Sequence, residues 1–479
     1  MSEKVKKVKR PPKLWEALVT LAFLAVVLAV GIAGFGADPH VPMFLGVSLA
    51  VVMAFRLGFT WDEIETSMKD GVYRVLQALM ILIVTGILIG VWIDAGVVPA
   101  MIYYGLKVLH PSIFLIATLI ICSITSIATG TSWGTVGTVG IALLGIGYGL
   151  GIDPGMTAGA IVSGAYFGDK MSPLSDTTNL APAMAGTDVM SHIRFMMFPT
   201  GVAYAISLVF YGVLGAVQYH GGDADMSKVA ELSGELARIF NLNPLLLLPP
   251  VIVIVSVALK APALLGLSFG IFSGAAVGLI LQPACNIGSL FISGMSGYSC
   301  ESSVAEVAKL LNRGGLTGMM YSVSMCILAM MFGGIMEDTR MMETIINKLK
   351  PLAKTPAALV VMTEITAIIA NFTMCAQYIA IIVPGRMFSR EYQEAGLSPE
   401  TLSNALESSA SVTSGLIPWN TCGAFMVTTL GMGALEFAPW AVFCWITPIV
   451  CAVMAFMGLT VADQNGVLLC KKRKAVVKE

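Results

Sequence analysis

The stretch GAYFGDKMSPLSDTTNLAP, residues 164–182, decides the fold of this chain. It places Asp169, Lys170 and Asp176 beside Ser, Thr and Asn residues, between apolar residues on either side. Proline removes a backbone donor and ends the helix before it, and glycine lets the chain unwind. We therefore expect a helix that is interrupted around Pro173, with charged groups at the break.

The composition of the chain indicates that this break lies in a membrane. Of the 479 residues, 56% are hydrophobic and only 12% are charged. A typical soluble domain carries about 25% charged residues, so a soluble protein this apolar could not cover its surface. The net charge of −1 gives no sign of a nucleic-acid partner. The sequence has no Gly-rich phosphate loop, zinc spacing or nucleophile–base pairing, so we expect no cofactor and no enzyme activity.

Apolar segments recur along the whole chain. A helix needs about 20 residues to span a bilayer. Two segments carry polar clusters at their midpoints and are expected to be re-entrant hairpins, which are tolerated where protein or a water-filled cavity covers the backbone. These hairpins are 111–149 and 356–388. The expected crossings are 14–36, 41–57, 72–97, 155–188, 192–217, 243–259, 262–282, 315–337, 401–431 and 437–462.

The distribution of basic residues predicts the orientation. With the N-terminus in the cytoplasm, 22 of the 28 Lys and Arg residues fall in cytoplasmic segments, as the positive-inside rule requires. We expect a multi-pass protein of a bacterial or archaeal cytoplasmic (inner) membrane, with both termini cytoplasmic. The expected parts are a basic N-terminus (1–13), a first transmembrane repeat (14–217), an extracytoplasmic linker (218–242), a second repeat (243–462) and a basic tail (463–479).

The two halves resemble each other weakly and in the same order. PMFLGVS (42–48) matches PALLGLS (262–268), and Pro173 matches Pro418. Each half has five expected crossings, an odd number, so the halves enter the membrane from opposite sides. This is the inverted-topology plan of many secondary transporters. The sequence thus predicts an all-α polytopic membrane protein with two inverted-topology repeats. Each repeat has about five transmembrane helices, a re-entrant hairpin and a helix broken at mid-membrane.

Polar side chains gather at the hairpin tips and helix breaks of both halves. Carboxylate, hydroxyl and carbonyl oxygens are hard ligands that suit Na⁺, whereas half-helix amino ends would suit a carboxylate substrate. The candidate ion- or substrate-binding residues are Thr129, Thr131 and Ser132 at the first tip, Asp169, Ser172, Asp176, Thr177 and Asn179 at the first break, Asn371 and Thr373 at the second tip, and Thr413, Asn420 and Thr421 at the second break.

The acidic groups carry the chemistry. An ionised carboxylate at the bilayer centre costs about 2.5 to 3.5 kcal/mol, so an acid there is a functional candidate. Burial favours the protonated carboxyl group and a nearby cation the ionised one, so competition between Na⁺ and H⁺ gives coupled antiport. Asp176 is the favoured transient ligand of both ions. Asp169 is the second candidate, or is bridged to Lys170 for structural reasons. Glu364 is either a further proton site or an ion-pair partner, and Glu407 belongs either to the site or to a helix interface.

Four glycines in the segment before the break are spaced for close helix packing. Gly155, Gly159, Gly164 and Gly168 include small-xxx-small spacings, which allow two helix backbones to approach closely in membranes. We expect them to serve packing and not binding.

At GTSWGT (130–135) and GDKMSPLSDTTN (168–179) the sequence resembles the NhaC family of bacterial Na⁺/H⁺ antiporters, over roughly residues 14–460. The resemblance implies paired hairpins, paired broken helices and, as in many relatives, a homodimer with an elevator-like moving domain. It also implies that the first-break candidates, Asp169, Ser172, Asp176, Thr177 and Asn179, belong to the site.

Two functions follow as expectations. The leading one is exchange of Na⁺ for H⁺ across the lipid bilayer by alternating access. The alternative is Na⁺- or H⁺-coupled exchange of a small organic anion such as malate, lactate or an amino acid, because relatives of this family include malate and lactate exchangers. A polar cluster without Arg favours the bare cation, since carboxylate clamps often use Arg.

Overall fold

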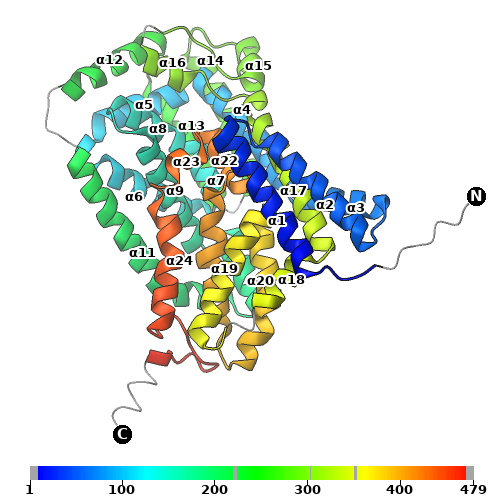
Figure 1. Ribbon diagram of the computed structural model, residues 1–479. Coiled ribbons are helices and arrows are strands. Elements are labelled where there is room, and N and C mark those ends of the chain that lie inside the picture. Colours follow the sequence, from blue (N-terminus) through cyan, green and yellow to red (C-terminus); the bar gives the residue numbers. More distant parts are fainter. Residues whose placement is uncertain (1–8, 219–223, 260, 303, 350–352, 471–479) are drawn as a thin grey trace, which may run out of the picture.

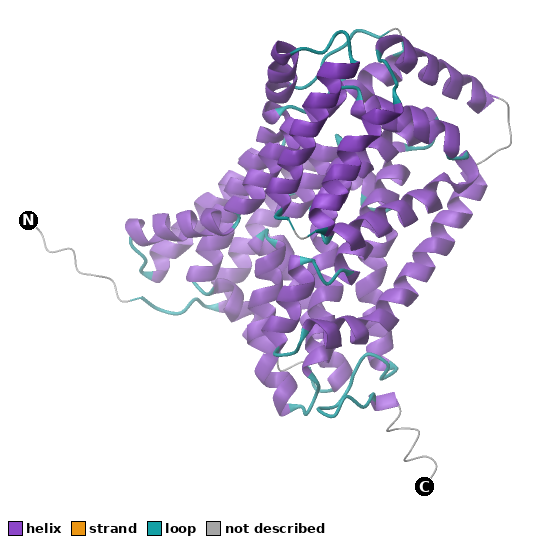
Figure 2. Ribbon diagram, turned by 180° about the vertical axis from the view of Figure 1, so that it is seen from behind, coloured by secondary structure: helices purple, strands orange, loops and turns teal. Residues whose placement is uncertain are grey.

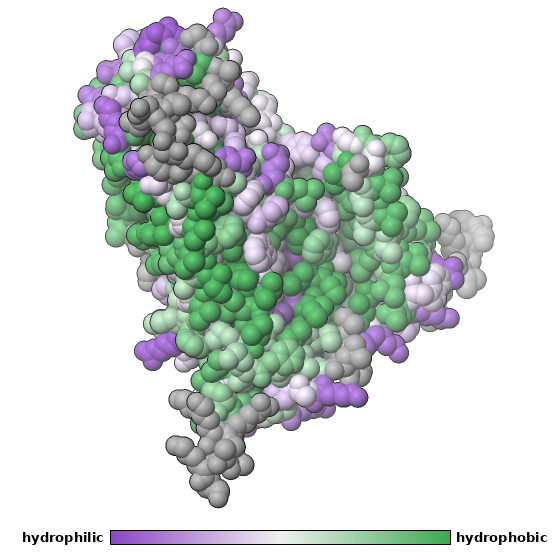
Figure 3. All heavy atoms as spheres, turned by 60° about the vertical axis from the view of Figure 1, so that its left-hand side comes forward, coloured by the Kyte–Doolittle hydropathy of each residue, from purple (hydrophilic) through white to green (hydrophobic). Residues whose placement is uncertain are grey.

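The computed structural model describes residues 9–218, 224–259, 261–302, 304–349 and 353–470. These residues form helices joined by loops, and the only β-structure among them is two isolated bridges (Figure 2). The all-helical prediction is confirmed. Figure 3 shows a broad apolar band with polar residues toward both ends, as expected for a protein surrounded by lipid.

The first half contains eleven α-helices and two π-helical turns among its described residues. They are α1 (Leu14–Ala29), η1 (Val30–Gly34), α2 (His40–Leu57), α3 (Trp61–Arg74), α4 (Leu76–Asp94), α5 (Val97–Val108), α6 (Pro111–Thr129), α7 (Ser132–Thr135), η2 (Val136–Gly140), α8 (Ile141–Gly149), α9 (Pro154–Met171), α10 (Asp176–Ala185) and α11 (Val189–Gln218).

The remaining described residues are also helical (Figure 1). Its elements are α12 (Ala224–Ile239), η3 (Pro244–Leu247), α13 (Leu248–Ala258), α14 (Ala263–Leu281), α15 (Ile287–Ser296), α16 (Ala305–Leu311), α17 (Leu316–Asp338), α18 (Met341–Leu349), α19 (Pro356–Met374), α20 (Gln377–Glu394), α21 (Pro399–Leu406), η5 (Glu407–Ser411), η6 (Ser414–Leu416), α22 (Thr421–Leu430), α23 (Ala434–Phe437) and α24 (Val442–Phe456). The inverted relation of the two halves stays a prediction.

Eight helices among the described residues are long and apolar enough to cross a membrane, and a bent pair raises this number to nine. The multi-pass membrane prediction is therefore confirmed. The first arm of each expected hairpin, α6 and α19, is among these eight helices. Each is long enough to cross the membrane, so the return of the chain to the same face also stays a prediction.

Three expected crossings differ from single straight helices. Segments 155–188 and 401–431 are each broken, the first between α9 and α10 and the second at η5 and η6. Segment 243–259 contains the second arm of a pair, Val229–Ile239 and Pro244–Val257, that bends by 99°. Prolines explain these interruptions, because residues before a proline are pushed out of the helical region and its missing N–H leaves a carbonyl without a partner.

Helix α3 was not expected from hydropathy. It is amphipathic and begins with a capping box, in which Thr60 Oγ1 accepts a hydrogen bond from the Glu63 backbone N–H at 3.4 Å. The Glu63 carboxylate accepts one in return from the Thr60 backbone N–H at 2.9 Å. The polar face of α3 hides its signal from a search for apolar segments. The helix ends at Arg74, directly before α4.

Helices α6 and α9 pack more extensively on each other than any other pair of described elements. A Cβ atom at Gly164 would lie 2.4 Å from the Leu119 carbonyl oxygen, and one at Gly168 would lie 2.4 Å from the Ser123 carbonyl oxygen. Only glycine fits such a close approach of two backbones. The packing prediction for these two glycines is confirmed, and it holds the break after α9 against the tip after α6.

The helices fall into two groups by their contacts. The first group contains α1 to α4, α13 to α15, α17 and α18. The second contains α6, α9 to α11, α19 to α21 and α24, while α22 packs against α17 of the first group. Both hairpin tips and both breaks belong to the second group, and α22 after the second break contacts the first group. A site built from the tips and breaks therefore faces the first group.

Candidate functional site

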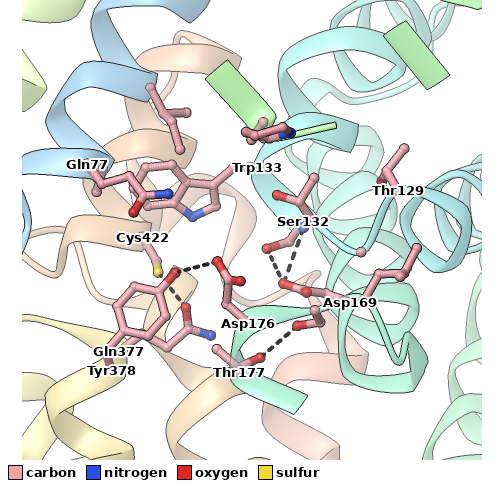
Figure 4. Close-up of a pocket in the computed structure, with 18 of the residues that line it drawn as sticks. Gln77, Thr129, Ser132, Trp133, Asp169, Asp176, Thr177, Gln377, Tyr378 and Cys422 are labelled. Atoms are coloured by element: carbon pink, nitrogen blue, oxygen red, sulfur yellow. Dashed lines mark hydrogen bonds between the residues drawn. The ribbon is translucent and has the colours of Figure 1, made fainter. Parts of the chain in front are cut away.

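A cavity of about 630 Å³ lies where the two groups of helices meet. One wall comes from the end of α3, the start of α4 and the connection between α13 and α14. The opposite wall combines the first hairpin tip, the first break, the start of α20 and the start of α22. Figure 4 shows the polar side chains of these elements pointing toward one another.

Asp169 stands in the last turn of α9 and is 8% exposed. Its Oδ2 accepts two hydrogen bonds from Ser132, one from the hydroxyl at 2.7 Å and one from the backbone N–H at 3.2 Å. Ser132 is the first residue of α7, so its N–H is one of the helix donors without an intrahelical partner. The hairpin tip thus orients the carboxylate at the break.

Asp176 is the first residue of α10, on the other side of the same break. Its side chain is exposed to the cavity and not buried in protein. The Tyr378 hydroxyl, from the start of the second hairpin's returning helix, donates to Asp176 Oδ2 at 3.5 Å (Figure 4). A carboxylate at the amino end of a helix is stabilised by the helix dipole. Asp176 therefore lies between the two hairpins, where an ion could reach it.

Hydroxyl and amide groups surround the two carboxylates. Thr177 and Ser175 share a hydrogen bond of 3.1 Å at the start of α10. Gln377 accepts a hydrogen bond from Cys422 Sγ at 3.2 Å, and its amide donates to the Ser411 carbonyl oxygen at 3.0 Å. These contacts join the two breaks and the second hairpin at one place.

The aromatic part of the wall comes from Trp133, which stacks on Phe425 of α22 with ring centroids 4.5 Å apart. This stack connects the first hairpin tip with the helix after the second break. Since aromatic side chains keep few rotamers, the stack keeps that side of the cavity in one shape.

The structure places about half of the candidate residues on the cavity. Seven of them line it, namely Thr129, Thr131, Ser132, Asp169, Asp176, Thr177 and Thr421.

The other six candidates are not among the cavity-lining residues and make local hydrogen bonds that hold the breaks and tips. Ser172 donates to the Ile127 carbonyl oxygen, and Asn179 to the Pro173 and Ser175 carbonyl oxygens. In the second half, Asn371 donates to Ala410 O and Thr413 Oγ1, Asn420 donates to Asn371 O, Thr413 to Ser409 O and Thr373 to Ile369 O. In transmembrane helices hydroxyl groups often bond their own backbone in this way.

The sequence patterns did not predict several of the residues that line the cavity. Gln77, Gln377 and Tyr378 stand in apolar runs, where a single polar residue gives only a weak signal. Arg74 also lines the cavity, where its guanidinium is paired with Glu337 of α17. The sequence predicted a site without Arg, and this was wrong for the cavity wall. Arg74 lies outside the polar clusters in the sequence, and helix α3 brings it to the cavity.

The chain is similar to known membrane antiporters over most of its length. The model of the Na⁺/H⁺ antiporter family matches residues 13–165 and 164–459. The chain is 37% identical to the malate-2H⁺/Na⁺-lactate antiporter of Bacillus subtilis, over 94% of this chain and 95% of that protein. It is 33% identical to the Na⁺/H⁺ antiporter NhaC of Alkalihalophilus pseudofirmus, over 95% and 98% of the two chains.

A third relative, the arginine/ornithine antiporter ArcD of Halobacterium salinarum, is 35% identical over 94% of this chain and 93% of its own. Matches of this extent cover both halves, both hairpins and both breaks. The chain belongs to the Na⁺/H⁺ antiporter family.

Proposed function

We propose that the protein exchanges Na⁺ for H⁺ across the membrane, and that the cation binds in the cavity at Asp169 and Asp176. One observation carries this proposal: two carboxylates from the two sides of one helix break face the same cavity, beside the tips of both hairpins. Hard oxygen ligands of this kind suit a small cation.

The exchange follows from competition for the carboxylates. A protonated carboxyl group has lost the charge that attracts Na⁺, and a bound Na⁺ favours the ionised form. If only the Na⁺-loaded and the proton-loaded forms change their access from one side to the other, the two ions move in opposite directions. The meeting of two helix groups at the cavity supplies a boundary along which access could change.

The second candidate is Na⁺- or H⁺-coupled exchange of a small organic acid. It is favoured by the cavity volume of about 630 Å³, which far exceeds that of one cation, and by Arg74 at the rim. The names of two relatives, a malate/lactate and an arginine/ornithine antiporter, agree with an organic substrate in this family. Arg74 is already paired with Glu337, which makes it less available to an anion than a free Arg.

The test is transport in proteoliposomes that contain a trapped pH-sensitive dye. With an imposed pH gradient and no organic acid present, external Na⁺ should collapse the gradient, and vesicles without protein should not respond. If proton movement requires malate, lactate or an amino acid on one side, the second candidate replaces the first.

A further inference from the structure

A cluster of three ionisable side chains lies outside the cavity, within the second group of helices. It consists of Lys170 on α9, Glu364 on α19 and Glu407 on η5, and we refer to these three residues as the buried ionic cluster. Their exposed fractions are 1%, 3% and 0%. Ionised groups at this depth in a membrane protein are rare and mark proton or ion sites when they occur.

One hydrogen bond connects the buried ionic cluster with a residue that lines the cavity. Glu407 Oε1 accepts a hydrogen bond of 3.1 Å from Thr177 Oγ1, and Thr177 lines the cavity. The amino group of Lys170 donates to Ser408 Oγ at 3.2 Å. It interacts electrostatically with both Glu407 and Glu364. One positive charge is therefore shared by two acids.

Glu364 is the less supported of the two acids. Among the described residues each acid has one carboxyl oxygen without a hydrogen-bond partner, Oε1 of Glu364 and Oε2 of Glu407. The other oxygen of Glu407 accepts a hydrogen bond from the Thr177 hydroxyl, a donor that faces Glu407 and not Glu364. The titratable groups that face Glu364 from the neighbouring elements are Lys170, the Cys451 thiol on α24 and the Tyr392 hydroxyl on α20. None of these adds a second positive charge. A buried carboxylate without its own cation is stable only when it is protonated.

We propose that Glu364 is a proton-binding site of the exchanger, separate from the cation cavity. This inference rests on the proposed Na⁺/H⁺ exchange. With the cavity free of Na⁺, Glu364 is a neutral carboxylic acid, and Lys170 is balanced by Glu407. Binding of Na⁺ beside Asp169 brings a positive charge next to Lys170 in the same water-poor region. The proton of Glu364 then leaves to solvent, in addition to the proton that Na⁺ displaces from the cavity carboxylates, so that a neutral acid becomes a carboxylate as one Na⁺ arrives.

The cavity and the buried ionic cluster are connected in two ways, through neighbouring residues of the chain and through one hydrogen bond. Asp169 and Lys170 are successive residues of α9, with Asp169 facing the cavity and Lys170 facing the cluster. On the other side of the break, Asp176 and Thr177 are also successive residues, and Thr177 reaches Glu407. If Na⁺ binding moves the break, it therefore moves Lys170 and the contact to Glu407, the two charged groups whose balance sets the charge of Glu364.

The test compares the wild-type protein with Glu364→Gln, which copies the shape of the protonated acid. In a weakly buffered detergent solution with a pH-sensitive dye, we measure protons released per bound ²²Na⁺. The wild type should release protons, and Glu364→Gln should release about one fewer for each Na⁺ bound, with a Kd for Na⁺ at alkaline pH within about threefold of the wild type. Glu394→Gln, an exposed acid of α20 paired with Arg390, is the matched control and should behave as the wild type.

The outcomes separate the two proposals. If the wild type binds no Na⁺ and releases no protons, the exchange proposal fails. If the wild type releases protons and Glu364→Gln releases the same number, the exchange proposal stands and Glu364 is not the site. Loss of all Na⁺ binding in folded Glu364→Gln also contradicts a site separate from the cavity.

A second measurement does not depend on the folding of that variant. Infrared difference spectra of the wild type with and without Na⁺ should show loss of a protonated carboxyl band. Glu364→Asp keeps a carboxyl group in an altered position and should shift that band. A spectrum without such a loss in the wild type, or a band unchanged in Glu364→Asp, overturns the inference.

Discussion

Asp169 and Ser132 are joined by two hydrogen bonds, although 37 positions separate them in the chain. The Ser132 hydroxyl and backbone N–H both point at the same carboxylate oxygen, at 2.7 Å and 3.2 Å (Figure 4). Hydrogen bonds to a charged group are shorter and stronger than neutral ones. The first hairpin tip and the first break therefore act as one unit, and a cation that binds Asp169 must fit the position that Ser132 imposes.

Ser132→Ala removes the hydroxyl donor and leaves the backbone donor. Because a hydrogen bond to a charged group contributes about 1.5 to 3 kcal/mol, we expect the KM for Na⁺ to rise roughly tenfold or more, with a smaller change in the maximal rate. Exchange rates in proteoliposomes at increasing Na⁺ concentrations measure this. Ser48→Ala is the control, since the Ser48 hydroxyl bonds only its own helix, at Phe44 O. An unchanged KM in Ser132→Ala contradicts the role of this contact.

Asp176→Asn keeps the size of the side chain and removes its charge. We expect a loss of exchange of at least about 100-fold, because the neutral amide cannot alternate between Na⁺ and H⁺, while the protein stays folded since the side chain is exposed to the cavity. Dye-based exchange assays and size-exclusion chromatography measure the two effects. Asp70→Asn, an exposed acid on α3, should exchange normally. Exchange by Asp176→Asn within twofold of the wild type would remove this residue from the mechanism.

Acidification should weaken the apparent affinity for Na⁺. Proton occupancy of a carboxylate rises as the pH falls, and a protonated site cannot hold the cation. For one competing proton, the KM for Na⁺ should rise about tenfold for each pH unit below the pKa of the site, and should level off above it. Initial exchange rates over a grid of pH and Na⁺ concentration test this. A KM that is independent of pH is incompatible with competition at the cavity.

Gly168→Ala should destabilise the protein. Its new Cβ atom would lie 2.4 Å from Ser123 O, a backbone atom that cannot move aside without displacing α6. Overpacking of this kind costs about 1 to 3 kcal/mol. Thermal unfolding in detergent should show a lower transition temperature and less folded protein. Gly201→Ala is the matched control, because no heavy atom lies within 4 Å of its added Cβ, and its transition temperature should not fall.

The sequence predicted the membrane class, the break near Pro173 and the packing role of Gly164 and Gly168. These follow from local properties, namely hydropathy, the missing donor of proline and the spacing of small residues along one helix face. It also placed Asp169 and Asp176 at the break. Each of these inferences needs only residues within about one helix length of one another.

Other features were beyond such reasoning. Helix α3 was missed because its polar face removes the hydropathy signal. Arg74, Gln77 and Tyr378 were missed because each is a single polar residue in a segment that otherwise reads as membrane helix. Conversely, Asn371 and Asn420 carried a strong polar signal but bond each other and the backbone near the second break, away from the cavity wall.

Composition and periodicity were sufficient to make this chain a bundle of membrane helices with one costly acidic break, since lipid leaves the backbone few alternatives to a helix. Whether a polar side chain faces the cavity or a neighbouring backbone depends instead on which helices pack together. Thr177 shows this: its hydroxyl reaches Glu407, 230 positions away, only because α10 packs against the second break. Contacts over such separations come from the joint packing of many apolar faces, which no single segment specifies.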